Sequence, residues 1–167
     1  GKVKFMERLG EILAGLKTGF AGCGRNDLLG SLIDQVEAVK RLSVYVSGVA
    51  VQKLGETIKE HQSVAEAIAN LVSWSYAFDS AVSRALVADP KGDGFHTKMC
   101  QVTLAERVPQ LISVARQTLI NIGGGDEKEF TPFLKALARL IEPLAVDTDK
   151  IYNEIATKVL EKEKYLL

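Results

Sequence analysis

The fold is decided by the stretch DLLGSLIDQVEAVKRLSVYVSGVAVQKLGETIKE, which runs from Asp27 to Glu60. Its apolar residues recur at steps of three and four, the spacing of one face of an α-helix. They are Leu29, Leu32, Ile33, Val36, Val39, Val46, Ala50, Leu54 and Ile58. At 1.5 Å per residue, the run predicts a single helix about 50 Å long.

One part of this stretch has the character of a strand. Residues 42–51, LSVYVSGVAV, alternate in polarity and are rich in β-branched side chains. We still predict a helix, because the apolar stripe passes through these residues in phase. An isolated strand in this chain would also have no partner strand.

Helical periodicity continues on both sides of this stretch. A capping box formed by Ser63 and Glu66 predicts where the next helix begins, and Pro109 should kink the helix after it. The predicted helices around Asp27–Glu60 cover residues 3–16, 63–88 and 95–122. Glycine-rich or proline-containing loops separate them at residues 18–26, 89–94 and 123–125.

Two shorter helices are predicted towards the end of the chain. Thr131 and Pro132 form the pattern of an N-cap followed by proline at the first helical position, and this helix should end at Glu142. Asp147 or Thr148 should cap a sixth helix, which ends in charged residues 161–164. Long helices joined by short connections predict an all-α, up-and-down bundle of about six helices, three of them long. Residues 1–167 fit one domain.

Composition narrows the functional classes. The chain is 47% hydrophobic and 25% charged, which are proportions of a globular protein. Lysine plus arginine and aspartate plus glutamate both number 21, so the sequence carries no electrostatic signature of nucleic-acid binding. Neither a signal peptide nor an apolar run of about 18 residues is present. We therefore expect a protein of the bacterial cytoplasm or the mitochondrial matrix, neither secreted nor transmembrane.

The cysteines and histidines could suggest a metal site. His96 and Cys100 are four residues apart and would share a helix face, but a closed zinc site needs about four ligands. Only Cys23 and His61 remain, and neither is at a ligand-like spacing. We predict no metal, and two free thiols in a reducing compartment. The glycines at 123–125 follow a helix rather than a strand, so we expect a C-cap and no phosphate cradle.

Asp79 is the polar residue whose position calls for an explanation. On a helical wheel it lies within about 20° of the apolar residues Ile68, Val72 and Leu86, and a carboxylate on an apolar stripe must be paired or protonated. We predict a buried ion pair with Arg107 of the next helix, or else with Lys98. A ligand contact or a catalytic acid or base is the alternative, but no second reacting group is evident. The sequence therefore predicts no catalytic residue.

Three aromatic residues cluster around Asp79. Trp74, Tyr76 and Phe78 cannot all share one helix face, so at least one should point away from the core. Ordinary core packing is one explanation of the cluster. An exposed aromatic residue is also typical of a protein interface, which makes Trp74 and Tyr76 candidate interface residues.

The stretch from Gln62 to Leu119 resembles a known domain. The resemblance rests on an apolar helix that carries Tyr76, Asp79 and Ser83-Arg84-Ala85, a short proline–glycine loop, then His96-Thr97-Lys98-Met99 and a second apolar helix. Residues 5–11, FMERLGE, add to it. Together they resemble the extra C-terminal helical domain of very-long-chain-type acyl-CoA dehydrogenases, over about two thirds of the chain.

This resemblance implies a function that depends on a larger protein. In that family FAD, the acyl-CoA thioester and the catalytic glutamate belong to the preceding catalytic core, in which two helical domains flank a β-domain. The resemblance implies no cofactor in this chain. It implies a domain that packs on the core of a fatty-acid β-oxidation enzyme, contributes to a homodimer and contacts a membrane surface.

Two further hypotheses remain open. The chain could be a stand-alone helical module that binds an apolar ligand or a partner protein, or it could be an enzyme that uses Asp79. Whether the reading frame extends upstream into a dehydrogenase core separates the accessory domain from the stand-alone module.

Overall fold

The computed structural model describes residues 2–162, and every regular element in this range is helical. The three long helices are α2 (Leu28–Leu54), α3 (Gln62–Ala88) and α4 (Phe95–Ile122), and a 3₁₀ helix, η1 (Gly55–Glu60), links the first two. Shorter helices are α1 (Lys2–Thr18), α5 (Glu127–Leu140) and α6 (Thr148–Lys162). The prediction of an all-α bundle with six α-helices, three of them long, is confirmed for the described residues.

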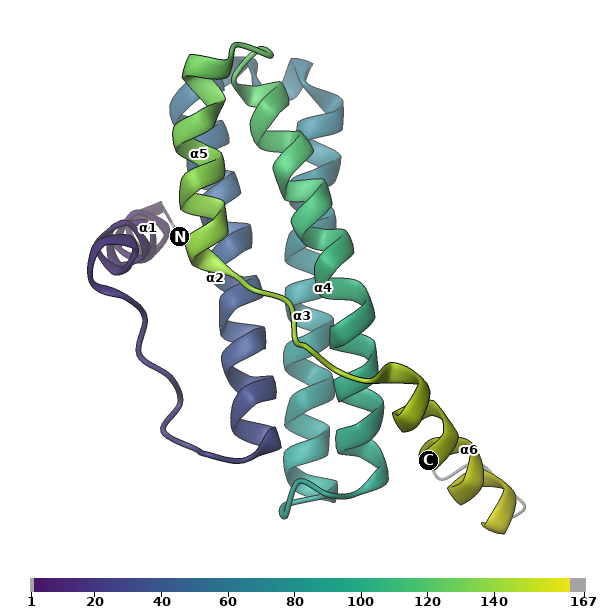
Figure 1. The fold of residues 1–167 in the computed structure, drawn as a ribbon. Helices are drawn as coiled ribbons and strands as arrows, with labels where there is room; N and C mark the ends of the chain where they lie inside the picture. Colours follow the sequence, from purple (N-terminus) through teal and green to yellow (C-terminus); the bar gives the residue numbers. More distant parts are fainter. Residues whose placement is uncertain (1, 163–167) are drawn as a thin grey trace.

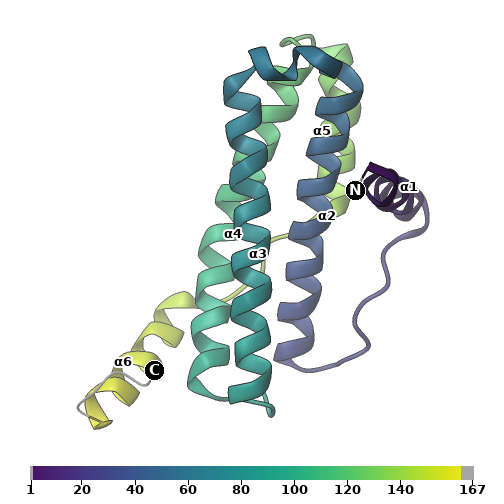
Figure 2. The same ribbon diagram turned by 180° about the vertical axis from the view of Figure 1, so that it is seen from behind.

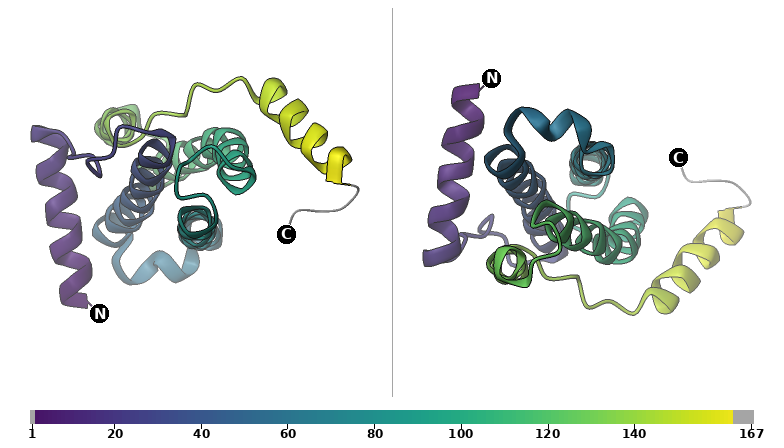
Figure 3. Two further views of the ribbon diagram at one scale, coloured as in Figure 1. Left: turned by 90° about the horizontal axis from the view of Figure 1, so that it is seen from below. Right: turned by 90° about the horizontal axis from the view of Figure 1, so that it is seen from above.

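Four of the helices form the bundle itself. Helices α2, α3 and α4 run up, down and up, and α5 returns along α2 and α4 (Figure 1). Helix α1 crosses the bundle on one side against α2 and α5, whereas α6 projects from the other side and packs on α4 (Figure 3). No helix of the described residues is long and apolar enough to cross a membrane.

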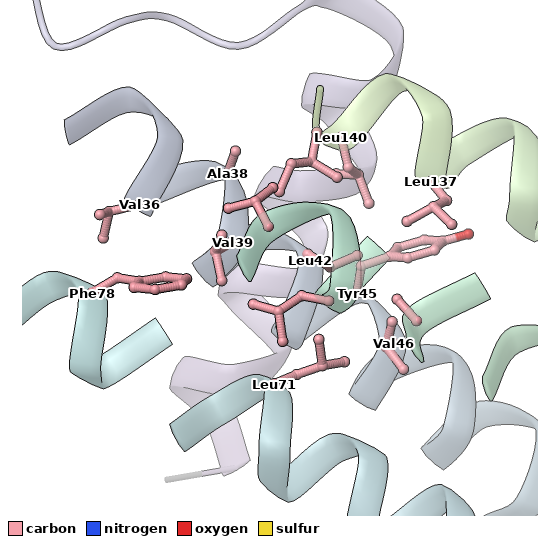
Figure 4. Packing of buried hydrophobic residues seen from close by; sticks show 14 of the residues in the cluster. Val36, Ala38, Val39, Leu42, Tyr45, Val46, Leu71, Phe78, Leu137 and Leu140 are labelled. Atoms are coloured by element: carbon pink, nitrogen blue, oxygen red, sulfur yellow. The ribbon is translucent and has the colours of Figure 1, made fainter. Parts of the chain in front are cut away.

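The core is built around α2. Its apolar residues face α3, α4 and α5, so that side chains from α3 (Leu71 and Phe78) and from α5 (Leu137 and Leu140) pack on them from different sides (Figure 4). The α2 residues in this cluster are Leu29, Leu32, Val36, Ala38, Val39, Leu42, Tyr45, Val46, Val49 and Ala50. Residues 42–51, the strand-like stretch, are helical throughout. Burial on several sides explains their composition, because packing of β-branched side chains in the core stabilises a helix more than their lower helix propensity destabilises it.

Two predicted helix starts are wrong. Helix α3 begins at Gln62 after His61, which makes no side-chain capping bond, so Ser63 and Glu66 lie inside the first turn and form no capping box. Helix α5 begins five residues before Pro132, because the Asp126 side chain accepts a hydrogen bond from the Lys128 N–H and caps it. The turn at Gly124 and Gly125, both at positive φ, reverses the chain early enough for this start.

The predicted long helix also ends early. The α-helical part stops at Leu54, because Gly55 adopts a φ of 53°, and residues up to Glu60 continue as a 3₁₀ helix. Pro109 lies inside α4 as expected. Asp147 precedes α6 and accepts a hydrogen bond from the Lys150 N–H, as predicted for the cap. Residues 163 and 164 of the predicted last helix lie outside the described range.

Candidate interaction surface

The register of α3 decides which of its side chains can meet a partner. Its buried residues are Val64, Ala67, Leu71, Ser75, Phe78, Val82 and Ala85, a stripe at steps of three and four. Asp79 follows Phe78 and is turned about 100° away from it. Its side chain is 50% exposed, and Val72 on the same flank is 49% exposed. The prediction that Asp79 is buried is therefore wrong, because the apolar residues used to place it flank the core.

Asp79 pairs with a residue of α2, not of α4. Its Oδ1 lies 2.7 Å from Nζ of Lys40, which also lies 2.8 Å from Oε1 of Glu37. Arg8 of α1 reaches the other oxygen of Glu37 at 3.2 Å. Partial burial acts to lower the pKa of Lys40, but the hydrogen bonds to Asp79 and Glu37 outweigh it and raise that pKa. The network joins α1, α2 and α3 at their surface.

Arg107 and Lys98, the predicted partners of Asp79, are engaged elsewhere. Arg107 donates to Oε1 of Gln110 at 2.8 Å, and its guanidinium lies over the ring of Trp74, 5.3 Å from the ring centre. Lys98 pairs with Glu154 of α6. Helix α4 thus meets α3 through a cation–π contact, and the predicted ion pair between Asp79 and Arg107 is absent from the described residues.

Of the two aromatic interface candidates, Tyr76 is free and Trp74 is not. Trp74 is partly buried and packs on Phe78 with ring centres 5.4 Å apart. The guanidinium of Arg107 lies over the ring of Trp74. The Tyr76 side chain is 76% exposed. The prediction that one aromatic points away from the core is confirmed for Tyr76.

Tyr76 belongs to a longer uncharged surface that we call the α3 outer face. Positions within about 80° of one another on the helical wheel define it, and all are exposed: Ala65, Ala69, Val72, Tyr76, Ser80, Ser83 and Val87. Val87 is 85% exposed. At its lower end lies a hollow of about 610 Å³ lined by Ser83, Arg84, Val87, Ala88 and His96. The sequence reasoning identified Tyr76 but missed the rest, although the lack of charge on this arc was a readable signal.

The residues considered for a metal site lie apart. His61 precedes α3 and His96 begins α4, at opposite ends of the bundle (Figure 1). Nδ1 of His96 lies 3.7 Å from Oδ2 of Asp89. Cys100 is buried, which together with the nearby Asp89 raises the pKa of its thiol to about 11, whereas Cys23 is exposed in the α1–α2 loop. Within residues 2–162 no group of three metal-ligating side chains comes together.

The fold is that of a domain from one enzyme family. Residues 38–139 match the family described as the acyl-CoA dehydrogenase, C-terminal domain, and the chain belongs to that family. It is 27% identical over 134 residues to a probable acyl-CoA dehydrogenase of Bacillus subtilis (strain 168), an alignment that covers 78% of this chain and 22% of that protein.

A solved structure extends the match. The crystal structure of an acyl-CoA dehydrogenase complexed with FAD from Bacillus anthracis has a TM-score of 0.79 and 25% sequence identity with this chain. The superposition covers 98% of this chain and 28% of that one. The chain therefore spans less than a third of the length of either relative.

Proposed function

We propose that this chain is a non-catalytic accessory domain of a larger FAD-dependent acyl-CoA dehydrogenase, of the very-long-chain type, that works in fatty-acid β-oxidation. The observation that carries the proposal is the unequal coverage: almost the whole chain superposes on 28% of a dehydrogenase whose structure contains FAD. The remaining length of such a protein is where flavin binding and the catalytic carboxylate would belong.

The interior of the domain supports a structural role. The buried polar side chains of the described residues are Gln35, Ser43, Ser75, Thr97 and Thr118, which are amides and hydroxyls. Asp79, the one carboxylate considered for catalysis, is half exposed and tied to Lys40. A catalytic acid or base needs a second reacting group within a pocket, whereas Asp79 has the contacts of a helix-linking ion pair.

The partner we propose first is the catalytic core of the same polypeptide. A contribution to a homodimer and a peripheral contact with a membrane surface are the other roles that such an accessory domain could have. Whichever of these roles the domain has, the parent enzyme would act in the bacterial cytoplasm or the mitochondrial matrix.

The test is the size and the flavin content of the protein made from the complete native reading frame. We expect a polypeptide about three and a half times as long as this chain, because 98% of this chain covers 28% of the solved relative and an alignment of 134 residues covers 22% of the other. It should release close to one equivalent of FAD on denaturation and reduce an electron acceptor with an acyl-CoA. The matched control is the 167-residue chain, which should release none.

Two outcomes would contradict the proposal. A native protein of 18.2 kDa would favour a stand-alone binding module. Stoichiometric FAD on the isolated chain would show that the cofactor site lies within it.

A further inference from the structure

We infer that the α3 outer face is the surface on which the domain docks against the dehydrogenase core of its own polypeptide. This inference rests on the proposed function, and it adds the face, the chemistry of the contact and the occupant.

The α3 outer face is uncharged and partly apolar. The arc from Ala65 to Val87 carries no charge. The charged residues Glu66 and Arg84 are exposed outside this arc, and the half-exposed Asp79 borders it but is paired with Lys40. A helix face that meets water normally carries charged and polar residues. Tyr76 and Val87 are the most exposed large apolar side chains of the helix, and contiguous exposed apolar surface marks interaction sites.

Among the described residues, helix α3 has fewer neighbouring helices than α2 or α4. Helix α2 is covered by α1 and α5, and α4 is covered by α5 and α6. Helix α3 packs only on α2, α4 and η1 within residues 2–162. Its outer face is therefore the surface of a long helix to which the described chain supplies no covering helix.

The place where a parent core would join this domain indicates what covers the α3 outer face. The matched family is a C-terminal domain, so the core of a parent enzyme would precede α1. The N-terminal end of α1 lies on the side of the bundle on which α3 is exposed, opposite α5 (Figures 2 and 3). A core joined there would meet the α3 outer face at the high effective concentration of a tethered partner.

A tethered core also fits the small size of the face. Stable interfaces between separate proteins usually take about 20–30 residues from each side, far more than this one helix offers. A free second copy would need additional contacts, whereas an attached core needs no comparable area.

The hollow at the end of the face indicates the chemistry of the matching surface. Val87, Ala88 and Arg84 all line it, and Arg84 forms no ion pair with any described residue. An apolar side chain next to a carboxylate could enter the hollow and pair with Arg84. We therefore expect the core to present a helix or loop with that combination.

Cysteine accessibility tests the inference directly. In a Cys23→Ser background, Ser80→Cys and Ser83→Cys place single thiols on the α3 outer face, and Ser113→Cys places one at an exposed position of α4 as the matched control. Alkylation rates are measured by peptide mass spectrometry, in the protein from the complete reading frame and in the 167-residue chain.

In the isolated chain we expect the three thiols to react at rates within about threefold. In the complete protein the thiols at positions 80 and 83 should react at least tenfold more slowly, with position 113 unchanged. Equal rates at all three positions in the complete protein would overturn the inference. Protection in the isolated chain that grows with its concentration would also overturn it, in favour of a second copy.

A second variant separates docking from folding. Tyr76→Lys changes an exposed side chain, so the melting temperature of the isolated chain should not change. In the complete protein it should restore alkylation at Ser80→Cys at least severalfold, and unchanged protection would contradict the docking role. If the reading frame encodes no dehydrogenase core, the proposed function fails before this experiment begins.

Discussion

At the scale of single residues, Asp79 shows how the rotation of a helix about its own axis decides whether a side chain is buried or exposed. Placed with Val72 and Leu86 it would be buried, whereas in the structure the neighbouring Phe78 occupies the core position. Asp79 then reaches Lys40 across the α2–α3 boundary at 2.7 Å. A half-exposed pair of this kind contributes about 0–1 kcal/mol, because water screens it and two long side chains must be ordered.

Double-mutant cycles should identify the partner of Asp79. Asp79→Ala and Lys40→Ala should show a coupling energy of about 0.2–1 kcal/mol in urea unfolding, since the two side chains are in contact. The same cycle with Arg107→Leu should show no coupling beyond about 0.3–0.5 kcal/mol, the usual additivity error. A coupling confined to Arg107 would contradict the register of α3 described above.

Substitution by alanine at two glycines inside helices should change the free energy of unfolding in opposite directions. A Cβ on Gly10 of α1 would meet no atom within 4 Å, whereas on Gly30 of α2 it would lie 2.5 Å from the backbone oxygen of Arg25. Gly10→Ala should therefore raise the free energy of unfolding by about 0.5–1 kcal/mol through helix propensity. Gly30→Ala should lower it by about 1–3 kcal/mol, because the loop must shift. Urea denaturation measures both, and the same sign for the two would refute the explanation.

At the scale of elements, α5 and α6 have similar length and different support. Helix α5 buries Leu137 and Leu140 against the bundle, whereas α6 packs on α4 alone. Helix α6 is held by the buried Ile151, by the hydrogen bond from the Tyr152 hydroxyl to Glu106 at 2.7 Å and by the ion pair between Glu154 and Lys98. Few buried apolar contacts mean a low free energy of local opening.

Amide hydrogen exchange should separate these two helices. The amides of α6 should exchange at least tenfold faster than those of α5, because α6 can open without disturbing the core. Helix α5 is the internal control, since it has 14 residues and α6 has 15. Equal protection would mean that α6 unfolds with the bundle.

The first residue of α5 could not be predicted from local sequence preferences. The start of α5 depends on Asp126, which follows three glycines and caps the helix with its own side chain. The pattern Thr131-Pro132 is an equally good local signal for a start. The choice between them depends on where the turn brings Phe130 against Gly123, and local preferences do not contain that information.

At the scale of the whole molecule, one apolar cluster extends from Ile12 of α1 through α2, α3 and α4 to Leu140 of α5. Helices α1 to α5 therefore share one core. The zero net charge of the chain is consistent with association through local surface chemistry and not through a general electrostatic field.

The sequence by itself determined the helical class, the existence of six α-helices and the direction of each long helix along the chain. These depend on short-range periodicity, on glycine and proline at the connections, and on loops too short to allow other arrangements. Spacing also predicted that at least one of Trp74, Tyr76 and Phe78 points away from the core, and the structure shows that this residue is Tyr76.

Only the tertiary structure decided the rotation of α3, and with it the partner of Asp79 and the extent of the α3 outer face. When a helix is apolar on more than one side, local sequence preferences do not decide how it is rotated about its axis. Packing of Leu71 and Phe78 against α2 (Figure 4) selects one of them, because the core must be filled from all its helices at once. Which face remains uncovered is a property of the assembled bundle, since it depends on where α1, α5 and α6 come to lie.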